Sequence, residues 1–399
     1  MLTREFPPNV YGGAGVHVEH LAAALTGHAE VSVHRFAGPG EGHDPVGGVY
    51  GTWDALAGGP PSQSALRFMA TDLAMAAQVA DAQVLHSHTW YANFAGTVAA
   101  LVHGIPHVLT THSLEPLRPW KREQLGGGYD LSCYIERTAV EQADAVIAVS
   151  AQMRGDVLAC YPRVDPERVH VIHNGIDPRV YRPDPATDVV ERLGIDPARP
   201  SVVFVGRITR QKGLPGLLDA AQLLDPDAQL VLLAGAPDTP EIGAEVRTRV
   251  EDLRRTRSGV VWVEEMVERP AVIQVLSAAT VFVCPSVYEP FGLVNLEAMA
   301  CEAAVVASAV GGIPEIVVED ATGHLVTLDE GPEGPEQGAA YARRLAEAVN
   351  DLVRDPERAR RMGQAGRRRV EEHFSWAAVA ERTAALYRQL VAAGPRTRA

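Results

Sequence analysis

The sequence is poor in several features that would point to a specialised class of protein. Only Lys121 and Lys212 are lysines among its 36 basic residues, and aromatic residues make up 6% of the 399. No apolar run approaches the roughly 20 residues that span a bilayer, and the first residues lack the charged-then-apolar layout of a secretory signal. We therefore expect a cytoplasmic protein that does not associate with a membrane.

Cysteine and net positive charge are scarce as well. The four cysteines form no C-x-x-C pair, which argues against a disulfide framework or a cysteine zinc site. Cys284 and Cys301 lie in apolar or helical stretches and are expected in the core. The net charge of −14 disfavours nucleic-acid binding. An anionic small-molecule substrate would therefore need positive charge that is concentrated locally.

The two lysines are informative because arginine replaces lysine everywhere else. Lysine is expected to remain where a compact, flexible point charge is needed, since the planar guanidinium is bulkier and aims differently. The alternative is that both are chance survivors. Both lie in glycine-rich, motif-like surroundings, which favours a functional role.

Short β-branched runs alternate with helical patterns along the chain, which predicts α/β architecture with two doubly wound, Rossmann-like domains. Five prolines between residues 177 and 200 indicate an inter-domain linker. We expect a first domain at 1–177, a linker at 178–200, a second domain at 201–374 and a last helix within 375–399. Such sheets bind ligands at the carboxyl ends of their strands, so the site is expected in a cleft between facing domains. Strands are expected at 31–36, 83–88, 107–111, 145–149, 169–172, 201–205, 230–234, 260–263, 280–284 and 304–308.

The chain leaves very little room for a first strand. Only Met1, Leu2 and Thr3 are available to form it, so either this strand is very short or the true start of the chain lies upstream. The glycines of the following Tyr11–Gly15 segment, with Gly12 and Gly13 at its centre, allow close backbone approach before an amphipathic helix. An anion such as a diphosphate fits at that helix N-terminus, although a plain strand-to-helix turn is an equal alternative.

A second motif, Gly206–Gly213, follows the first expected strand of the second domain. Arg207 and Lys212 lie five residues apart on this loop and can converge on one phosphate group. They would neutralise a diphosphate leaving group as its charge develops. A solvated loop is the alternative.

A third motif places two glutamates eight residues apart. Glu289 lies in a Pro/Gly loop after a strand, and Glu297 lies one turn into the following helix. Carboxylates suit the hydroxyls of a sugar or a ribose, and the amides of Gly292–Val294 cap the helix. Glu297 has apolar neighbours, so a buried carboxylate there would need a partner, which a ligand supplies.

A fourth motif is His86-Ser87-His88 at the carboxyl end of a strand. Residues two apart share a face of a strand and can bind metal, but no third ligand of matching context is evident, so no metal is expected. His88 as a hydrogen-bond donor to a sugar hydroxyl is favoured over a satisfied core histidine. Further along, Arg118 and Lys121 follow a strand end that carries Ser113, which indicates an anion site.

Together these motifs resemble the GT-B glycosyltransferases, in particular retaining family 4, in which an E-x7-E element accompanies an arginine and a lysine. At finer grain, TREFPPNVYGGAGVHV, HSHTWYANFAG and HNGID are similar to the actinobacterial-type glycogen synthases, also described as α-maltose-1-phosphate synthases. That family uses ADP-glucose and elongates glucan ends or, preferentially, glucose 1-phosphate. The resemblance covers essentially the whole chain.

The resemblance implies a role for each candidate residue and a final helix that crosses back to the first domain. It implies no cofactor and no metal, and leaves a homodimer open. It also implies a front-face displacement in which the leaving phosphate accepts the acceptor's proton. The catalytic group comprises Arg207, Lys212, Glu289 and His88; the donor-binding group comprises Gly12, Gly13, Asn174, Phe291, Gly292, Leu293, Val294 and Glu297; and the acceptor-binding group comprises Thr89, Ser113, Arg118 and Lys121.

Several alternatives stay open at this point. The sequence does not separate ADP from UDP or GDP as the nucleotide, nor glucose 1-phosphate from a glucan as the acceptor. Another family 4 transferase with a different nucleotide-sugar or small acceptor fits the same motifs. A GT-B sugar-nucleotide epimerase or a non-catalytic nucleotide-sugar sensor would share the fold.

Overall fold

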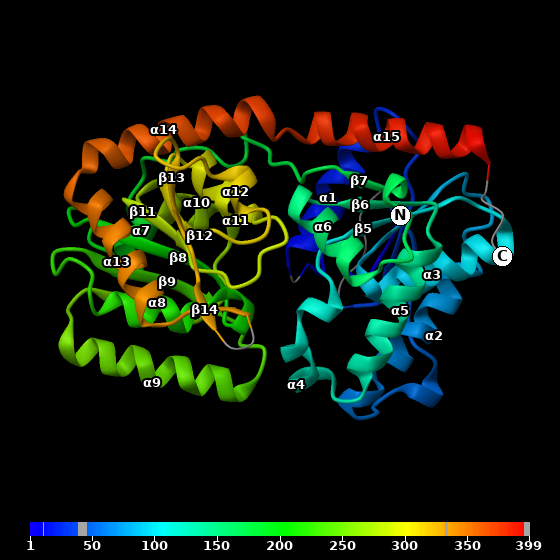
Figure 1. Ribbon diagram of the computed structural model, residues 1–399, viewed down its shortest axis with the longest axis horizontal. Coiled ribbons are helices and arrows are strands. Elements are labelled where there is room, and N and C mark those ends of the chain that lie inside the picture. Colours follow the sequence, from blue (N-terminus) through cyan, green and yellow to red (C-terminus); the bar gives the residue numbers. More distant parts are fainter. Residues whose placement is uncertain (11, 39–45, 332–333, 395–399) are drawn as a thin grey trace. The chain divides into compact units, whose positions relative to one another are not determined.

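The computed structural model describes residues 1–10, 12–38, 46–331 and 334–394, which form two compact units. The first unit comprises Met1–Gly175 together with the chain from Trp376 onward, and the second comprises Ile176–Ser375. Each unit contains one parallel sheet with helices on its faces (Figure 1). This is the doubly wound α/β architecture that the alternating sequence pattern predicts.

The sheet of the first unit has the order β3-β2-β1-β4-β5-β6-β7, and all its neighbouring strands are parallel. The strand order reverses between β1 and β4, which is where doubly wound sheets bind ligands. The strands are β1 Leu2–Thr3, β2 Val33–Phe36, β3 Val46–Tyr50, β4 Leu85–His88, β5 His107–Thr111, β6 Ala145–Ala148 and β7 Val169–Val171; the helices are α1 Gly13–Leu25, α2 Ser64–Ala76, α3 Thr89–His103, α4 Arg122–Leu125, α5 Gly128–Gln142, α6 Ala151–Cys160 and α15 Trp376–Ala393.

The sheet of the second unit has the order β10-β9-β8-β11-β12-β13, again with parallel neighbours, and its order reverses between β8 and β11. A short antiparallel hairpin, β14–β15, follows it. The strands are β8 Ser201–Arg207, β9 Gln229–Gly235, β10 Val260–Val263, β11 Val281–Cys284, β12 Ala304–Ser308, β13 Gly323–Val326, β14 Asp329–Gly331 and β15 Gly334–Glu336; the helices are α7 Asp188–Arg192, α8 Leu214–Ala221, α9 Pro240–Thr256, α10 Arg269–Ser277, α11 Leu293–Ala300, α12 Ile313–Ile316, α13 Ala339–Arg354 and α14 Pro356–His373.

The proline-rich stretch at 178–200 is not the separate linker that the sequence suggests, because it folds with the second unit. It contains helix α7, whose first amides are bound by a side chain of α10. Oε1 of Gln274 accepts hydrogen bonds from the amides of Val189 and Val190 at 2.6 and 3.1 Å. The proline content correctly indicated an irregular segment. Burial of Val190 and this capping contact hold the segment against the rest of the second unit.

Helix α15 returns to the first unit and packs on α1 and the sheet, as the resemblance implied (Figure 1). Trp376, Val379 and Ala380 share one apolar cluster with Leu21 and Leu25 of α1. The indole of Trp376 also stacks on His20, with 5.4 Å between ring centroids. The burial of this apolar stripe explains why the last helix belongs to the unit that begins the chain.

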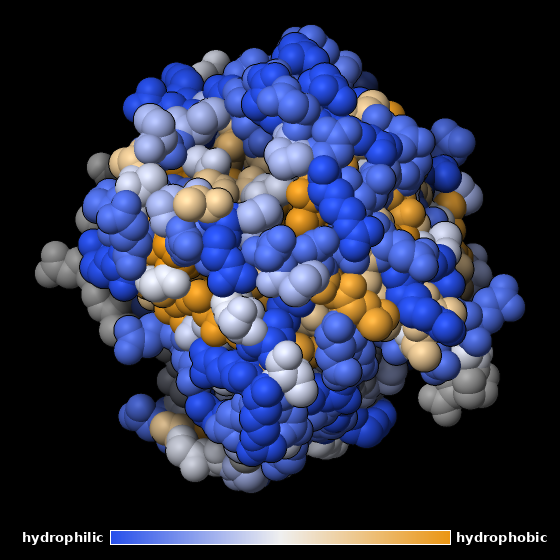
Figure 2. All heavy atoms as spheres, turned by 90° about the vertical axis from the view of Figure 1, so that its left-hand side faces the viewer, coloured by the Kyte–Doolittle hydropathy of each residue, from blue (hydrophilic) through white to orange (hydrophobic). Residues whose placement is uncertain are grey.

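The helices that cover the second sheet are amphipathic. Ile242, Val246, Val250 and Leu253 of α9 are buried at intervals of about one turn, and most of the positions between the last three are charged. Seen from the side of α9 and α13, the surface is largely hydrophilic with apolar patches between (Figure 2). Cys284 and Cys301 are buried free thiols, as expected. None of the described helices is long and apolar enough to cross a membrane.

Helix α3 approaches the first sheet closely because small residues line its inner face. A Cβ added at Gly96 would lie 2.2 Å from Nε2 of His107, which is buried and bonded to Ser87. Gly155 of α6 is exposed and faces open space. We predict that Gly96→Ala lowers the free energy of unfolding by about 1–3 kcal/mol, whereas Gly155→Ala raises it by about 0.4–1 kcal/mol. Urea unfolding of both variants tests this, and equal effects would contradict the close approach.

Candidate active site

The loops at the carboxyl ends of β8 and β11 carry the second unit's candidate residues, at the point where the strand order reverses. Lys212 follows β8 and Glu289 follows β11. Backbone contacts join the two loops: the amide of Val287 donates to the carbonyl of Gln211 at 2.9 Å. The hydroxyl of Thr209 accepts from the amide of Lys212 and caps the turn that carries this lysine. Parallel strands therefore bring residues 77 positions apart into one site.

Lys212 and Glu289 form an ion pair at the centre of this site. Nζ of Lys212 donates to Oε2 of Glu289 at 2.7 Å, and the Ser286 hydroxyl donates to the same oxygen at 3.0 Å. Burial is the largest single effect and lowers the pKa of Lys212, but the charge and hydrogen bond of Glu289, with Cys284 and Glu297, together outweigh it and the pKa is raised. The lysine is therefore a permanent cation at neutral pH, and the glutamate holds its ammonium group in place.

Arg207 holds a different carboxylate. Its guanidinium donates to Oδ1 of Asp238 at 2.6 Å, in the loop between β9 and α9. Arg207 remains 44% exposed at its side chain, whereas that of Asp238 is 10% exposed. The two cations thus each have an acidic partner in the free protein, and their convergence on one phosphate stays a prediction.

The Glu289 loop leads into the N-terminus of α11. Gly292 has φ +105°, and Gly311 has φ +55° with space for no side chain, because a Cβ would lie 1.9 Å from the carbonyl oxygen of Glu289. Phe291 is buried and meets Phe374 edge-on. Leu293 and Val294 open α11, so their amides belong to its first turn. These contacts fix the direction of the helix N-terminus that we expect to face an anion or a sugar.

Glu297 lies in α11 and bonds to Tyr181, whose hydroxyl donates to Oε1 at 3.0 Å. Burial raises the pKa of Glu297 to about 7, and this effect exceeds the lowering by the Tyr181 hydrogen bond and by Arg269 and Lys212. The carboxyl group consequently changes its charge near neutral pH. Its role toward ribose hydroxyls stays a prediction.

In the first unit, Gly12 and Gly13 lie at the N-terminus of α1, directly after the loop that follows β1. The amide of Gly12 donates to Oε2 of Glu5 at 3.0 Å. A carboxylate therefore already accepts a hydrogen bond from this glycine segment, in keeping with a helix end that favours negative charge. Tyr11 lies outside the described residues.

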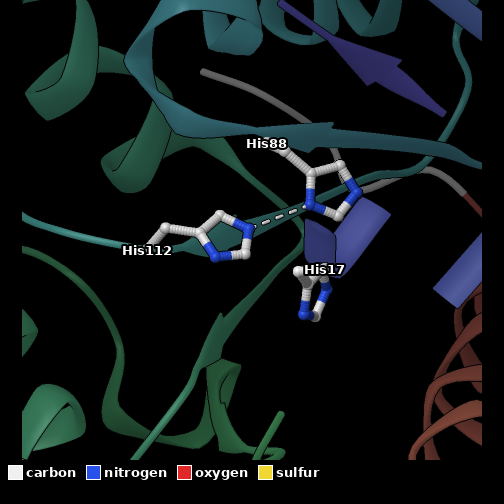
Figure 3. Close-up of side chains that lie close together, drawn as sticks. All are labelled: His17, His88 and His112. Carbon is white, nitrogen blue, oxygen red and sulfur yellow. Dashed lines mark hydrogen bonds between the residues drawn. The ribbon is translucent and has the colours of Figure 1, made fainter. Parts of the chain in front are cut away.

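Three imidazoles meet near the carboxyl ends of β4 and β5. From the sequence we expected no metal because no third ligand was evident, and that reason is wrong. His88 at the end of β4 hydrogen-bonds His112 at 3.2 Å, and His17 of α1 lies beside both (Figure 3). His86 is not one of them: its two nitrogens bond to Tyr387 at 2.5 Å and Thr110 at 2.7 Å. The third imidazole, for which the sequence near His88 gave no indication, comes from helix α1.

Asn174 is part of the same region. Its Oδ1 accepts a hydrogen bond from Nδ1 of His17 at 2.8 Å, and both side chains are buried. Asn174 therefore has a structural role, which is to orient His17. Its expected contact with the donor sugar stays a prediction.

The predicted acceptor residues lie on and near the segment after β5. Arg118 donates to the Ser113 hydroxyl at 2.8 Å and to Oε1 of buried Glu115 at 3.2 Å. Lys121 is buried and donates to Gln124 at 2.5 Å. Thr89 opens α3 with φ +63°, which is rare for a β-branched residue and often marks a functional position. The structure joins Ser113 to Arg118; binding of a phosphate by this group stays a prediction.

Sequence reasoning missed the groups that hold the candidate residues in place. Asp238 bonds to Arg207, Ser286 bonds to Glu289, and Tyr181 bonds to Glu297. Asp238 and Tyr181 are distant from their partners in the sequence, and Ser286 belongs to no motif of its own. Tyr181 lies in the stretch that was expected to be a linker.

Comparison with known proteins agrees with this arrangement. A family model for Glycosyltransferase Family 4 matches residues 11–180, and one for Glycosyl transferases group 1 matches 187–369. An alpha-maltose-1-phosphate synthase from Mycolicibacterium smegmatis is 55% identical over 98% of this chain and 99% of its own length. An alpha-maltose-1-phosphate synthase from Mycobacterium tuberculosis H37Rv is 53% identical over 98% of this chain and 99% of its own length. The solved structure of a sucrose-phosphate synthase from Thermosynechococcus elongatus superposes with a TM-score of 0.79 at 28% identity, over 99% of this chain and all of the other.

The two Rossmann-like units and the matched family models define a glycosyltransferase of the GT-B class. Within that class, the chain belongs to the family of the alpha-maltose-1-phosphate synthases.

The raised pKa of Glu297 predicts a pH dependence for donor binding. Above about pH 7 the group is a carboxylate that can accept from two ribose hydroxyls, and below it the group is protonated. If only the ionised form binds, the KM for the nucleotide-sugar rises about tenfold between pH 8 and pH 6, because the competent fraction falls by that factor. Steady-state kinetics of the parent and of Glu297→Gln check this. Glu297→Gln should have a higher KM for the nucleotide-sugar that does not change with pH. A KM that still rises about tenfold from pH 8 to pH 6 in this variant would contradict the assignment.

Proposed function

We propose that this glycosyltransferase moves glucose from ADP-glucose to glucose 1-phosphate, giving α-maltose 1-phosphate, or to glucan ends in α-glucan synthesis. The observation that carries the proposal is the identity of 53–55% along the full chain with relatives named alpha-maltose-1-phosphate synthase. The Lys212–Glu289 pair supports it, since a partly buried cation beside a carboxylate suits a charged leaving group and a sugar.

The proposed reaction retains the configuration at the anomeric carbon. The bond from that carbon to the diphosphate oxygen breaks, and the bond to the acceptor oxygen forms on the same face. The acceptor's proton passes to the departing phosphate oxygen. Lys212 and Arg207 would stabilise the charge that develops on the diphosphate, so their contribution is electrostatic.

Glu289 is suited to position the sugar and the lysine rather than to attack the sugar. Its Oε2 accepts hydrogen bonds from both Lys212 and Ser286, which lowers the nucleophilicity of that oxygen. Through the same contacts it keeps the ammonium group at a fixed point before the donor binds. Preorganised charge of this kind needs no rearrangement during the reaction.

The acceptor would be recognised through its phosphate. Arg118, Ser113, Lys121 and Thr89 supply two cations and two hydroxyl groups in one region of the first unit. Charge-assisted hydrogen bonds from such groups favour a phosphorylated sugar over a neutral glucan end. We propose that the transfer needs no metal and no cofactor, so EDTA should leave activity intact.

Product analysis tests the proposal directly. Incubation with ADP-glucose and glucose 1-phosphate should give a disaccharide phosphate with an α-1,4 linkage, identified by mass and NMR. UDP-glucose, GDP-glucose and an assay without acceptor run in parallel. Preference for another nucleotide or acceptor would indicate a different family 4 transferase, conversion of the donor alone would indicate an epimerase, and no turnover would indicate a sensor.

The acceptor assignment has its own test in Lys121→Ala. Loss of a charge-assisted hydrogen bond should raise the KM for glucose 1-phosphate about 10- to 100-fold while changing the KM for glycogen little. Arg122→Ala is the matched control, because this neighbouring cation is exposed and paired with Asp130. Equal changes with both acceptors would refute a phosphate-binding role for Lys121.

A further inference from the structure

The three histidines that meet in the first unit come from three separate elements. His17 lies on α1, His88 ends β4 and His112 follows β5, and one ring nitrogen of each lies within 4.8 Å of the others (Figure 3). His17 and His88 are at least 98% buried. Only His88 among them has an expected role toward the donor sugar, so the convergence of the other two rings requires a separate explanation.

The spacing of two of these nitrogens matches metal coordination. Nδ1 of His88 and Nε2 of His112 lie 3.2 Å apart. Two imidazole nitrogens bound to one tetrahedral zinc at about 2.0–2.1 Å lie about 3.3 Å apart. A metal ion can therefore replace the shared proton of this pair, and a ring nitrogen of His17 lies within 4.8 Å of both.

The state of His17 fits a ligand role. Asn174 accepts a hydrogen bond from Nδ1 of His17, which places the proton on that nitrogen and leaves a lone pair on Nε2. Nε2 is buried and has no hydrogen-bond partner. An amide or carboxylate oxygen that orients the far side of a histidine in this way is the usual second contact of a metal site.

His86 shows the contrast to these three rings. Both of its ring nitrogens are hydrogen-bonded, to Tyr387 and Thr110, so neither is available to an ion. An imidazole of ordinary pKa is mostly neutral at pH 7.5, so each of the three rings has a lone pair to offer at that pH.

We propose that His17, His88 and His112 form a binding site for a first-row transition ion, with Zn²⁺ as the best match to three imidazoles. A fourth coordination position stays open to water or a ligand oxygen. The ion is not required for transfer. Because His88 is our candidate for contact with the donor sugar, a bound ion inhibits the enzyme, and this consequence alone rests on the proposed function.

Cobalt(II) absorption provides a test that does not depend on activity. The full chain, treated with chelator and dialysed, is titrated with Co²⁺ at pH 7.5 and the visible bands of four- or five-coordinate cobalt are recorded. We expect one equivalent to bind in the parent. Zn²⁺ should displace it, since zinc binds such ligands more tightly than cobalt. Octahedral bands alone, or no saturation at one equivalent, would overturn the proposal.

Variants locate the ion. His112→Ala should abolish the bands, and Asn174→Ala, which spares all three ligands, should weaken Co²⁺ binding about 10- to 100-fold. His324→Ala is the control, because His324 with Glu319 and Asp320 forms a second, more exposed group of potential ligands in the other unit. Retention of the bands in His112→Ala, or their loss in His324→Ala, would contradict the site. Circular dichroism confirms that each variant is folded.

The activity arm separates this proposal from the proposed function. Micromolar Zn²⁺ should inhibit transfer from ADP-glucose and EDTA should restore it. If cobalt binds at one equivalent but the product assay fails, the metal site stands and the proposed function falls. If the product forms but cobalt gives no bands, the proposed function stands and the metal site falls.

Discussion

The ion pair between Lys212 and Glu289 is the interaction on which the account of this enzyme depends. It joins two loops that follow β8 and β11, the strands between which the order of the second sheet reverses. A partly buried lysine would lose its charge more readily without the carboxylate, and the buried carboxylate would lack its cationic partner without the lysine. The pair therefore keeps a cation available where a diphosphate is expected, although that cation must exchange part of its contact with Glu289 for the substrate.

Much of the remaining structure serves to hold such groups at the carboxyl edges of two parallel sheets. Gly213 and Gly311 occur where a side chain would collide with the carbonyls of Pro285 and Glu289, so the loops can approach each other closely. In the first unit the equivalent position, between β1 and β4, carries the Gly12–Gly13 segment and His88. Each unit thus presents its candidate residues at its own reversal point, as expected for doubly wound sheets.

The sequence predicted the parts of this arrangement that are encoded locally. Apolar β-branched runs located most strands, and the glycine- or proline-containing loops after them pointed to Lys212 and Glu289, which the structure joins as an ion pair. Other elements have weaker local signals. Strand β3 contains Gly47 and Gly48 and is half-exposed, and helix α3 begins with aromatic residues of modest helix propensity.

Contacts between distant segments were not predictable in the same way. The approach of His17 to His88 and His112 depends on how α1 packs against β4 and β5, so a pattern search near His88 could not reveal a third imidazole. Similarly, proline content at 178–200 indicated irregular chain but not that Gln274 would bind it or that Tyr181 would bond to Glu297. Propensity and spacing describe segments, whereas these contacts result from tertiary packing.

A crystal structure with bound nucleotide-sugar tests the central claim most directly. The account predicts that the diphosphate contacts the ammonium group of Lys212 and the guanidinium of Arg207, with Glu289 still bonded to the lysine or to the sugar. A diphosphate that lies away from both cations, with the Lys212–Glu289 pair undisturbed, would contradict it.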